Sequence, residues 1–133
     1  GYYLYEAGSR QGKPDPDVLT LIDEERARKG IKARSFSKAE IQRRCLAAMA
    51  NEGARLLREG IAVRPSDIDV VMLFGYGFPR WRGGPMKASD LMGLMEMRLS
   101  LETYAKEDTR FWAPDPIFAD LEKNGAEFDS LNG

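Results

Sequence analysis

The sequence predicts an all-α fold, a single helical domain that follows an irregular N-terminal arm. The composition is that of a folded chain, because 43% of the 133 residues are hydrophobic and 31% are charged. A chain of this length buries enough surface for one core, whereas two independent domains would each be marginal. Apolar residues also recur at helical spacing in segments that open on capping residues and close at glycines. We therefore divide the chain into an arm or linker over residues 1–14 and a helical domain over residues 15–133.

Local signals set the ends of the first two predicted helices. The Asp15-Pro16 pair is a helix start, because Asp caps free N–H groups and Pro loses no hydrogen bond at the first helical position. Gly30 ends this first helix. Residues 37–40 form a Ser-Lys-Ala-Glu capping box, and a long helix is expected to follow over residues 38–59.

One carboxylate falls on the apolar stripe of this long helix. The stripe places Glu52 in line with Ile41, Cys45, Ala48, Met49 and Leu56. Because an unpaired buried charge is costly, we predict that Glu52 accepts backbone N–H groups of a neighbouring loop or helix start. Gly53 lowers helix stability by about 1 kcal/mol relative to Ala, which predicts close approach of another backbone. Cys45 is expected to be a small buried residue.

The segment over residues 65–75 has two interpretations. Residues 66–69 resemble a second capping box, in which Asp67 and Asp69 serve as cap residues, and helical spacing continues to Gly75. A buried strand over residues 70–74 is the alternative, because periodicity alone cannot exclude a strand in so short a run. The cap favours the helix.

Two further helices are predicted towards the C-terminus. One long helix is expected to start within residues 86–89 and to end near residue 106. It carries too many leucines for one narrow stripe, so we expect it to be wedged between other helices. The Asp115-Pro116 pair repeats the earlier helix start and predicts a short helix that stops at Asn124.

A glycine-rich segment over residues 75–85 is the most unusual part of the sequence. It is not a dinucleotide fingerprint, because the third glycine of GxGxxG would fall on Arg80 and the preceding element is predicted to be helical. One interpretation is a structured loop in which Phe78 and Trp81 fill the core. The other is an anion site in which Arg80 and Arg82 meet a phosphate or a carboxylate.

Residue counts exclude several kinds of chemistry. The chain has no His, which removes the usual general base and every Ser–His or Cys–His arrangement. Its one Cys forms no internal disulfide or thiolate zinc site, so no metal is predicted and an intracellular, cytoplasmic location is expected. The formal net charge of −1 disfavours nucleic acid as a partner. No run of 18 apolar residues is present for a membrane span.

Several motifs within residues 37–94 match a known family in combination. Their residues are Asn51, Glu52, Gly53, Asp67, Asp69, Gly75, Gly77, Phe78, Pro79, Trp81, Gly83, Gly84 and Pro85. They resemble the C-terminal helical domain of 3-hydroxyacyl-CoA dehydrogenases, and residues 78–85 resemble its second, final copy in multifunctional fatty-acid β-oxidation enzymes. Residues 1–5 resemble the aromatic end of the first copy. The chain also lacks an initiator Met, so we expect it to be part of a longer polypeptide.

The resemblance implies a dehydrogenase that uses NAD to oxidise a 3-hydroxyacyl-CoA to a 3-ketoacyl-CoA. It also implies that NAD and a catalytic His–Glu pair belong to a Rossmann domain upstream, so no cofactor and no catalytic residue is expected in this chain. The first helical copy supplies an Asn, followed by Arg, eight residues before its Asn-Glu pair. Arg43 and Arg44 stand at that place here, and we therefore carry no catalytic residue over.

By the same resemblance, the domain acts through packing. Paired helical domains build a dimer or pseudo-dimer in the family, so the expected partners are the preceding helical copy and the Rossmann domain, with acyl-CoA as the substrate of the full enzyme. We expect the isolated piece to be inactive and to form a homodimer through the face meant for the missing copy. Arg80 and Arg82 are secondary candidates for contact with CoA phosphate. The alternative is a stand-alone helical protein-interaction module, which an upstream reading frame without a Rossmann fingerprint would favour.

Overall fold

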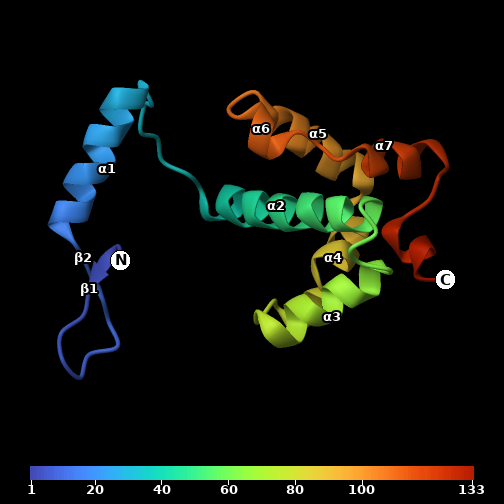
Figure 1. Ribbon diagram of the computed structural model, residues 1–133, viewed down its shortest axis with the longest axis horizontal. Coiled ribbons are helices and arrows are strands. Elements are labelled where there is room, and N and C mark those ends of the chain that lie inside the picture. The colour runs from blue at the N-terminus through green and yellow to red at the C-terminus, as the bar shows by residue number, and fades with distance from the viewer. The chain divides into compact units, whose positions relative to one another are not determined.

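The computed structural model describes all residues from 1 to 133, and the chain divides into one unit over residues 1–36 and another over residues 37–133. The all-α prediction is confirmed, because the only sheet is a two-stranded one in the first unit (Figure 1). By packing, the N-terminal unit extends beyond the predicted arm and includes the first helix. The domain division at residues 14 and 15 stays a prediction.

The N-terminal unit consists of a short hairpin and one helix. Strand β1 (Tyr3–Leu4) pairs antiparallel with β2 (Lys13–Pro14), and helix α1 (Pro16–Lys29) follows directly. Both predicted ends of α1 are confirmed. The Asp15 carboxylate accepts the backbone N–H of Asp17 at 3.0 Å, and Gly30 ends the helix in the left-handed conformation with φ of 65°. No residue of α1 is buried, so the start and end of this helix are set by its own capping residues and not by packing.

Helix α2 is the central element of the C-terminal unit. In Figure 1, α3 and α4 lie on one side of it and α5, α6 and α7 on the other. The elements in chain order are α2 (Lys38–Arg58), α3 (Pro65–Gly75), the 3-10 helix η1 (Arg80–Arg82), α4 (Pro85–Met92), α5 (Leu94–Ala105), α6 (Thr109–Trp112), α7 (Pro116–Lys123) and the 3-10 helix η2 (Phe128–Asn132). The predicted cap of α2 is confirmed, because Ser37 Oγ accepts the backbone N–H of Glu40 at 3.1 Å.

The core forms where small residues of α2 let neighbouring helices approach. Ala47, Ala50 and Ala54 are fully buried on one face of α2. The larger core side chains are Leu46, Met86, Met97, Leu101, Phe118 and Phe128. Phe118 of α7 and Phe128 of η2 meet edge to face, with their ring centroids 5.4 Å apart. Such packing supplies most of the free energy that holds a small helical domain together.

The predicted buried stripe of α2 is wrong in its phase. Ile41 is 50% exposed and Cys45 is exposed, whereas Leu46 and the three alanines face the core. The buried residues of α2 therefore lie on nearly the opposite side of the helix from the predicted stripe, because each residue turns the helix by about 100°. The stripe predicted from sequence followed the larger side chains, but close helix packing placed the small ones inside.

The same rotation overturns the hypothesis for Glu52. This residue is exposed, and its carboxylate pairs with Arg55 Nη1 at 3.1 Å instead of accepting backbone N–H groups. Gly53 is buried, and a Cβ there would collide with the sulfur of Met86. The predicted close approach at Gly53 is thus real, but a side chain makes it instead of a backbone.

Glycine also divides the long helix predicted over residues 86–106. Gly93 has φ of 96° and ψ of 126°, so α4 ends before it and α5 begins after it. That conformation lies far from helical values and is readily adopted only by Gly. Two other predictions are confirmed. Residues 65–75 are a helix and not a strand, and Asp115 caps α7 through the N–H of Ile117.

Candidate functional site

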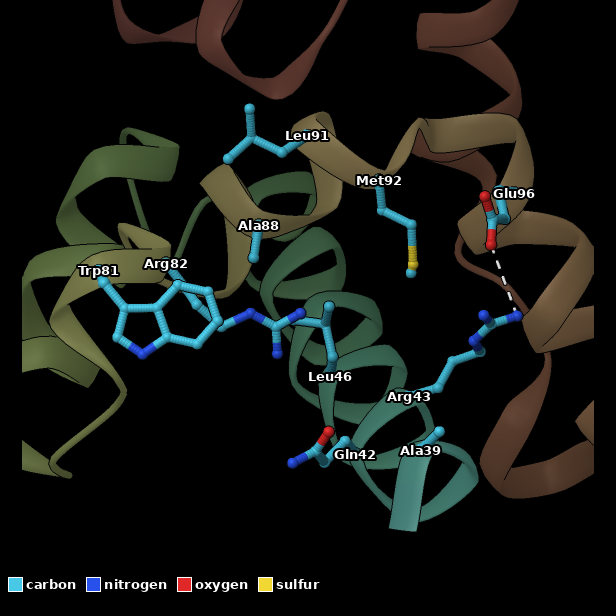
Figure 2. A pocket seen from close by; sticks show the side chains of 10 residues that line it. All are labelled: Ala39, Gln42, Arg43, Leu46, Trp81, Arg82, Ala88, Leu91, Met92 and Glu96. Carbon is cyan, nitrogen blue, oxygen red and sulfur yellow. Dashed lines mark ion pairs between the residues drawn. The ribbon is translucent and has the colours of Figure 1, made fainter. Parts of the chain in front are cut away.

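A cavity of about 400 Å³ opens in the C-terminal unit where α2, η1, α4 and the start of α5 meet (Figure 2). Its lining residues are Ala39, Gln42, Arg43, Leu46, Trp81, Arg82, Ala88, Leu91, Met92 and Glu96. Leu46 and Ala88 are buried and form an apolar floor, whereas the residues of η1 and the first turns of α2 supply the polar and aromatic groups. This cavity contains Arg82, one of the two arginines that the sequence predicted to meet an anion.

Arg82, which the sequence predicted as an anion-binding residue, lines this cavity. Its side chain reaches across the cavity towards Leu46 in Figure 2. The residue is half-buried, and the structure gives its guanidinium no carboxylate partner. The guanidinium carbon lies 5.4 Å from the ring centroid of Trp81, a cation–π contact. Arg82 is therefore held in place while its charge is left available.

The other cation of the cavity is already paired. Arg43 Nη1 lies 3.5 Å from Glu96 Oε1, and both side chains are about half exposed. An exposed ion pair of this kind contributes about 0–1 kcal/mol, so Glu96 holds Arg43 only weakly. Gln42 adds an exposed amide beside this pair.

The two predicted anion-binding arginines do not converge. Arg80 points elsewhere, with its guanidinium carbon 5.3 Å from the ring centroid of Phe74 in α3. Trp81 is 84% exposed, so the prediction that it fills the core is wrong, whereas Phe78 is 7% exposed and does fill it. The three-residue turn of η1 aims successive side chains in different directions, which sequence spacing could not show.

Asp69 holds the end of the glycine-rich segment in place through hydrogen bonds to the start of α4. Its carboxylate accepts the backbone N–H groups of Met86 at 2.8 Å and Lys87 at 3.0 Å, which are free donors at the start of α4. Asp69 therefore caps α4 and not its own helix, so the predicted capping box of α3 is wrong. Burial raises the pKa of the Asp69 carboxyl above its usual value, and the two N–H bonds partly offset that rise.

The glycine-rich segment does not fit a dinucleotide. A pyrophosphate needs the free N–H groups at a helix start that follows a strand. Here the preceding element is helix α3, and the Asp69 carboxylate already occupies the start of α4. These residues are thus arranged for packing, and the segment lacks the strand-to-helix turn of a dinucleotide fingerprint.

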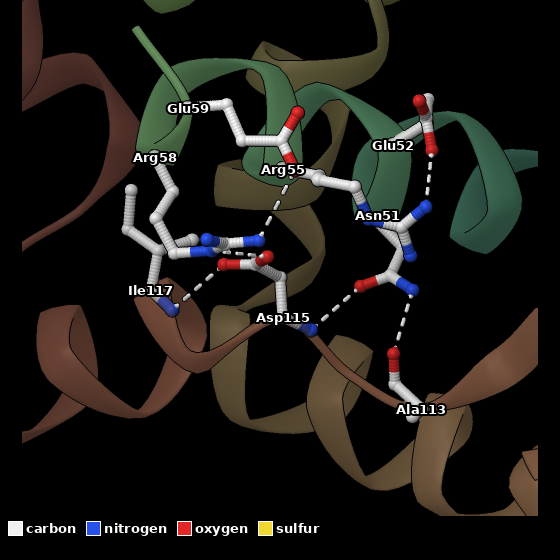
Figure 3. A network of polar contacts seen from close by, with 8 residues as sticks. All are labelled: Asn51, Glu52, Arg55, Arg58, Glu59, Ala113, Asp115 and Ile117. Atoms are coloured by element: carbon white, nitrogen blue, oxygen red, sulfur yellow. Dashed lines mark hydrogen bonds and ion pairs between the residues drawn. The ribbon is translucent and has the colours of Figure 1, made fainter. Parts of the chain in front are cut away.

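The motif around Asn51 fastens α7 to α2 (Figure 3). Asn51 is buried, donates from Nδ2 to the carbonyl of Ala113 at 2.9 Å, and accepts the N–H of Asp115 at 2.8 Å. The Asp115 carboxylate in turn accepts Arg58 Nε at 2.8 Å. The buried polar residue of the Asn-Glu-Gly motif is therefore Asn51, and its role is structural.

Asp67 and Asp90 also hold structural positions. Asp67 pairs with Arg64 Nη2 at 2.7 Å, and this hydrogen bond lowers the pKa of the Asp67 carboxyl. Asp90, which the sequence analysis did not single out, is buried and accepts the N–H groups of Phe128 and Asp129, each at 2.9 Å. A carboxylate in an apolar run was the only available signal for Asp90.

Two kinds of site are absent from the described chain. No group of three or more His, Cys, Asp or Glu residues is placed to hold a metal ion. None of the helices combines the length and the apolar character that crossing a bilayer demands.

Comparison with known proteins places this architecture in a family. The profile of the family described as 3-hydroxyacyl-CoA dehydrogenase, C-terminal domain, matches residues 41–127. The peroxisomal bifunctional enzyme of Danio rerio is 44% identical over 129 residues, which cover 95% of this chain and 18% of that protein. The human enzyme of the same name is 40% identical over 109 residues, covering 81% of this chain and 15% of that protein. The glyoxysomal fatty acid beta-oxidation multifunctional protein MFP-a of Brassica napus is 35% identical over 130 residues, covering 95% of this chain and 18% of that protein.

These relatives correct one prediction and confirm another. Their names place them in peroxisomes or glyoxysomes, so the cytoplasmic location expected from sequence is wrong. A low cysteine count indicates a reducing compartment at most and does not tell one organelle from another. The chain spans less than a fifth of the length of these relatives. The resemblance seen in the sequence is confirmed, and the chain belongs to the family of 3-hydroxyacyl-CoA dehydrogenase C-terminal domains.

Proposed function

We propose that this chain is the last helical domain of a peroxisomal, NAD-dependent enzyme that oxidises 3-hydroxyacyl-CoA to 3-ketoacyl-CoA in fatty-acid β-oxidation. Family membership and the names of the relatives support this proposal. The chain has no His to act as a base, and its glycine-rich segment does not fit NAD. The hydride transfer and the catalytic base therefore belong to an upstream Rossmann domain.

Within that enzyme, the domain acts by packing against the preceding helical domain and by shaping the acyl-CoA cleft. The observation that supports this role is the outer face of α3, where Val70, Val71 and Phe74 are 53%, 56% and 73% exposed. A contiguous apolar face of this kind marks an interaction surface. Each such side chain contributes about 1.5–3 kcal/mol when it is fully buried, so covering the face stabilises an assembly by several kcal/mol.

A split-enzyme experiment tests this role. The upstream part of the longer enzyme and this chain are produced separately, and NADH formation from a 3-hydroxyacyl-CoA is measured for each part and for the mixture. We expect no activity from this chain alone, a low rate from the upstream part, and a higher rate together with co-elution when both are mixed. Oxidation by this chain alone would contradict the proposal.

Surface variants make the test specific. Val71→Asp combined with Phe74→Asp places charge on the α3 face, which should abolish both co-elution and the gain in rate. Phe111→Asp is the matched control, because Phe111 is also exposed, at 57%, but lies on α6. The alternative of a stand-alone interaction module predicts that mixing leaves the dehydrogenase rate unchanged.

A further inference from the structure

We propose that the cavity between α2, η1 and α4 binds the phosphorylated adenosine end of a CoA thioester, with the base on Trp81 and the phosphate against Arg82. This rests on the proposed acyl-CoA substrate and adds a binding subsite to it. The reacting carbon of the substrate lies elsewhere, so these residues hold the substrate and take no part in the chemistry.

Trp81 provides a flat surface for an aromatic base. Its side chain is 84% exposed, and the Arg82 guanidinium lies over one face of the ring. The opposite face is therefore open to solvent. Purine bases stack on exposed aromatic side chains of this kind, and the stacking does not require hydrogen bonds to the edge of the base. Phe78 and Pro85, which flank the turn of Trp81, are buried. They fix this turn and so keep the Trp81 ring in place.

Arg82 provides the charge that a phosphate requires. It is half-buried, it has no carboxylate partner, and planar guanidinium groups bind phosphate through two parallel hydrogen bonds. Arg43 stands across the same cavity, and its only ion pair is the long, exposed one to Glu96. A phosphate held by Arg82 gains further attraction from Arg43 if that pair opens.

The size and lining of the cavity favour a nucleotide over a single carboxylate. A volume of about 400 Å³ falls within the range of roughly 300–1,000 Å³ that small-molecule sites occupy. An acidic side chain of a neighbouring domain would neutralise Arg82 but would leave most of this volume and the Trp81 face uncovered. A phosphorylated adenosine covers the open face of Trp81 with its base and places its phosphate against Arg82 in the cavity.

Tryptophan fluorescence gives a direct test with CoA as the probe. The chain has two tryptophans, so Trp112→Phe leaves Trp81 as the only reporter. We expect CoA to quench Trp81 in a saturable way. We expect Arg82→Gln to weaken binding at least about tenfold, because it removes the charge-assisted hydrogen bonds of the guanidinium to the phosphate. Arg80→Gln is the matched control, because it removes the same charge from the same turn but from a side chain that lies over Phe74. We expect it to change the affinity by less than about twofold.

Calorimetry on the unsubstituted chain measures the affinity for CoA without the Trp112 substitution. Dephospho-CoA, which lacks the phosphate monoester on the ribose, should bind about tenfold more weakly than CoA. Inorganic phosphate at the same concentration should leave Trp81 unquenched, which separates CoA from a free phosphate as the ligand.

Three results would overturn the inference. The first is no binding of CoA at millimolar concentration, and the second is equal weakening by the Arg80 and Arg82 variants, which would indicate diffuse charge attraction. The third is an Arg82→Gln variant that binds CoA normally but no longer associates with the upstream part of the enzyme. That result would assign Arg82 to a protein contact. Loss of association in the α3 variants with CoA binding intact would instead count against the proposed packing role alone.

Discussion

Asp69 lies so close to Gly84 that no side chain fits between them. A Cβ built on Gly84 would overlap the Asp69 carboxyl group, and Gly84 has φ of +111°, which side chains rarely allow. The contact exists because the Asp69 carboxylate must reach past Gly84 to the N–H groups of Met86 and Lys87. The glycine in the family motif is therefore a requirement of this cap.

Substitution of Gly84 should destabilise the domain. We expect Gly84→Ala to lower the free energy of unfolding by about 2–4 kcal/mol, because it adds backbone strain to a steric clash. Urea denaturation followed by circular dichroism measures the change. Gly75→Ala is the control, since Gly75 ends α3 with no positive φ and no neighbour near its added Cβ. Equal stability of the two variants would contradict the assigned role of Gly84.

Removal of the Asn51 side chain should loosen α7. We expect Asn51→Ala to lower the free energy of unfolding by about 1–3 kcal/mol, because the N–H of the buried Asp115 loses its acceptor. Glu52→Ala, one residue along, should change it by less than about 0.5 kcal/mol, because Glu52 is exposed. Thermal and urea unfolding of both variants checks the contrast. A larger loss for Glu52→Ala would restore the buried role first expected for Glu52.

The Asp69 carboxyl should titrate above its unfolded value of 3.8. Burial raises its folded-state pKa, so the folded state binds this proton more tightly than the unfolded chain does. The stability that this group contributes is thus fully present below pH 3.8 and is lost as the pH rises through the folded-state pKa. Carbon-13 NMR titration of the carboxyl carbons measures it, with Asp67 as the internal reference whose pKa is lowered. An Asp69 midpoint below that of Asp67 would refute the assignment.

Glu25 of α1 should show the opposite pH dependence. Its carboxylate pairs with Arg28 Nη2 at 2.6 Å and Lys29 Nζ at 3.1 Å, and the hydrogen bond from Arg28 above all lowers its pKa to about 2. The contribution of this group to helix stability is present above its unfolded pKa of 4.5 and is lost as the pH falls towards 2. NMR signals of α1 should therefore lose helical shifts at acid pH, and Glu25→Gln should remove that dependence.

The exposed face of α3 should drive self-association when no upstream domain is present. We expect the chain to form a homodimer, because a symmetric pair is the simplest way to cover an apolar face. Light scattering should give about twice the monomer mass, and Val71→Asp with Phe74→Asp should return the monomer. A monomer at every accessible concentration would show that this face alone does not suffice for a dimer.

Much of the local structure was already decided by neighbouring residues. Helix starts at Asp15, Ser37 and Asp115 were predictable because a capping side chain bonds to N–H groups two or three residues away. Gly30 was predictable as an end for the same reason, since a left-handed residue needs no distant partner. The family could also be predicted from sequence, because its motifs are short runs of residues that can be recognised without the structure.

Only the tertiary structure decided which atoms meet across helices. The inner face of α2 and the partner of Asp69 depend on how closely other helices approach. The separate directions of Arg80 and Arg82 likewise depend on the aromatic rings that lie beside them. Hydrophobic periodicity predicts that a segment is helical, but it does not show which neighbouring helix will cover it. Small residues become the buried face when close packing between helices contributes more than burial of the larger side chains. The sequence thus determined the helices and the family, and packing determined the cavity that holds Arg82.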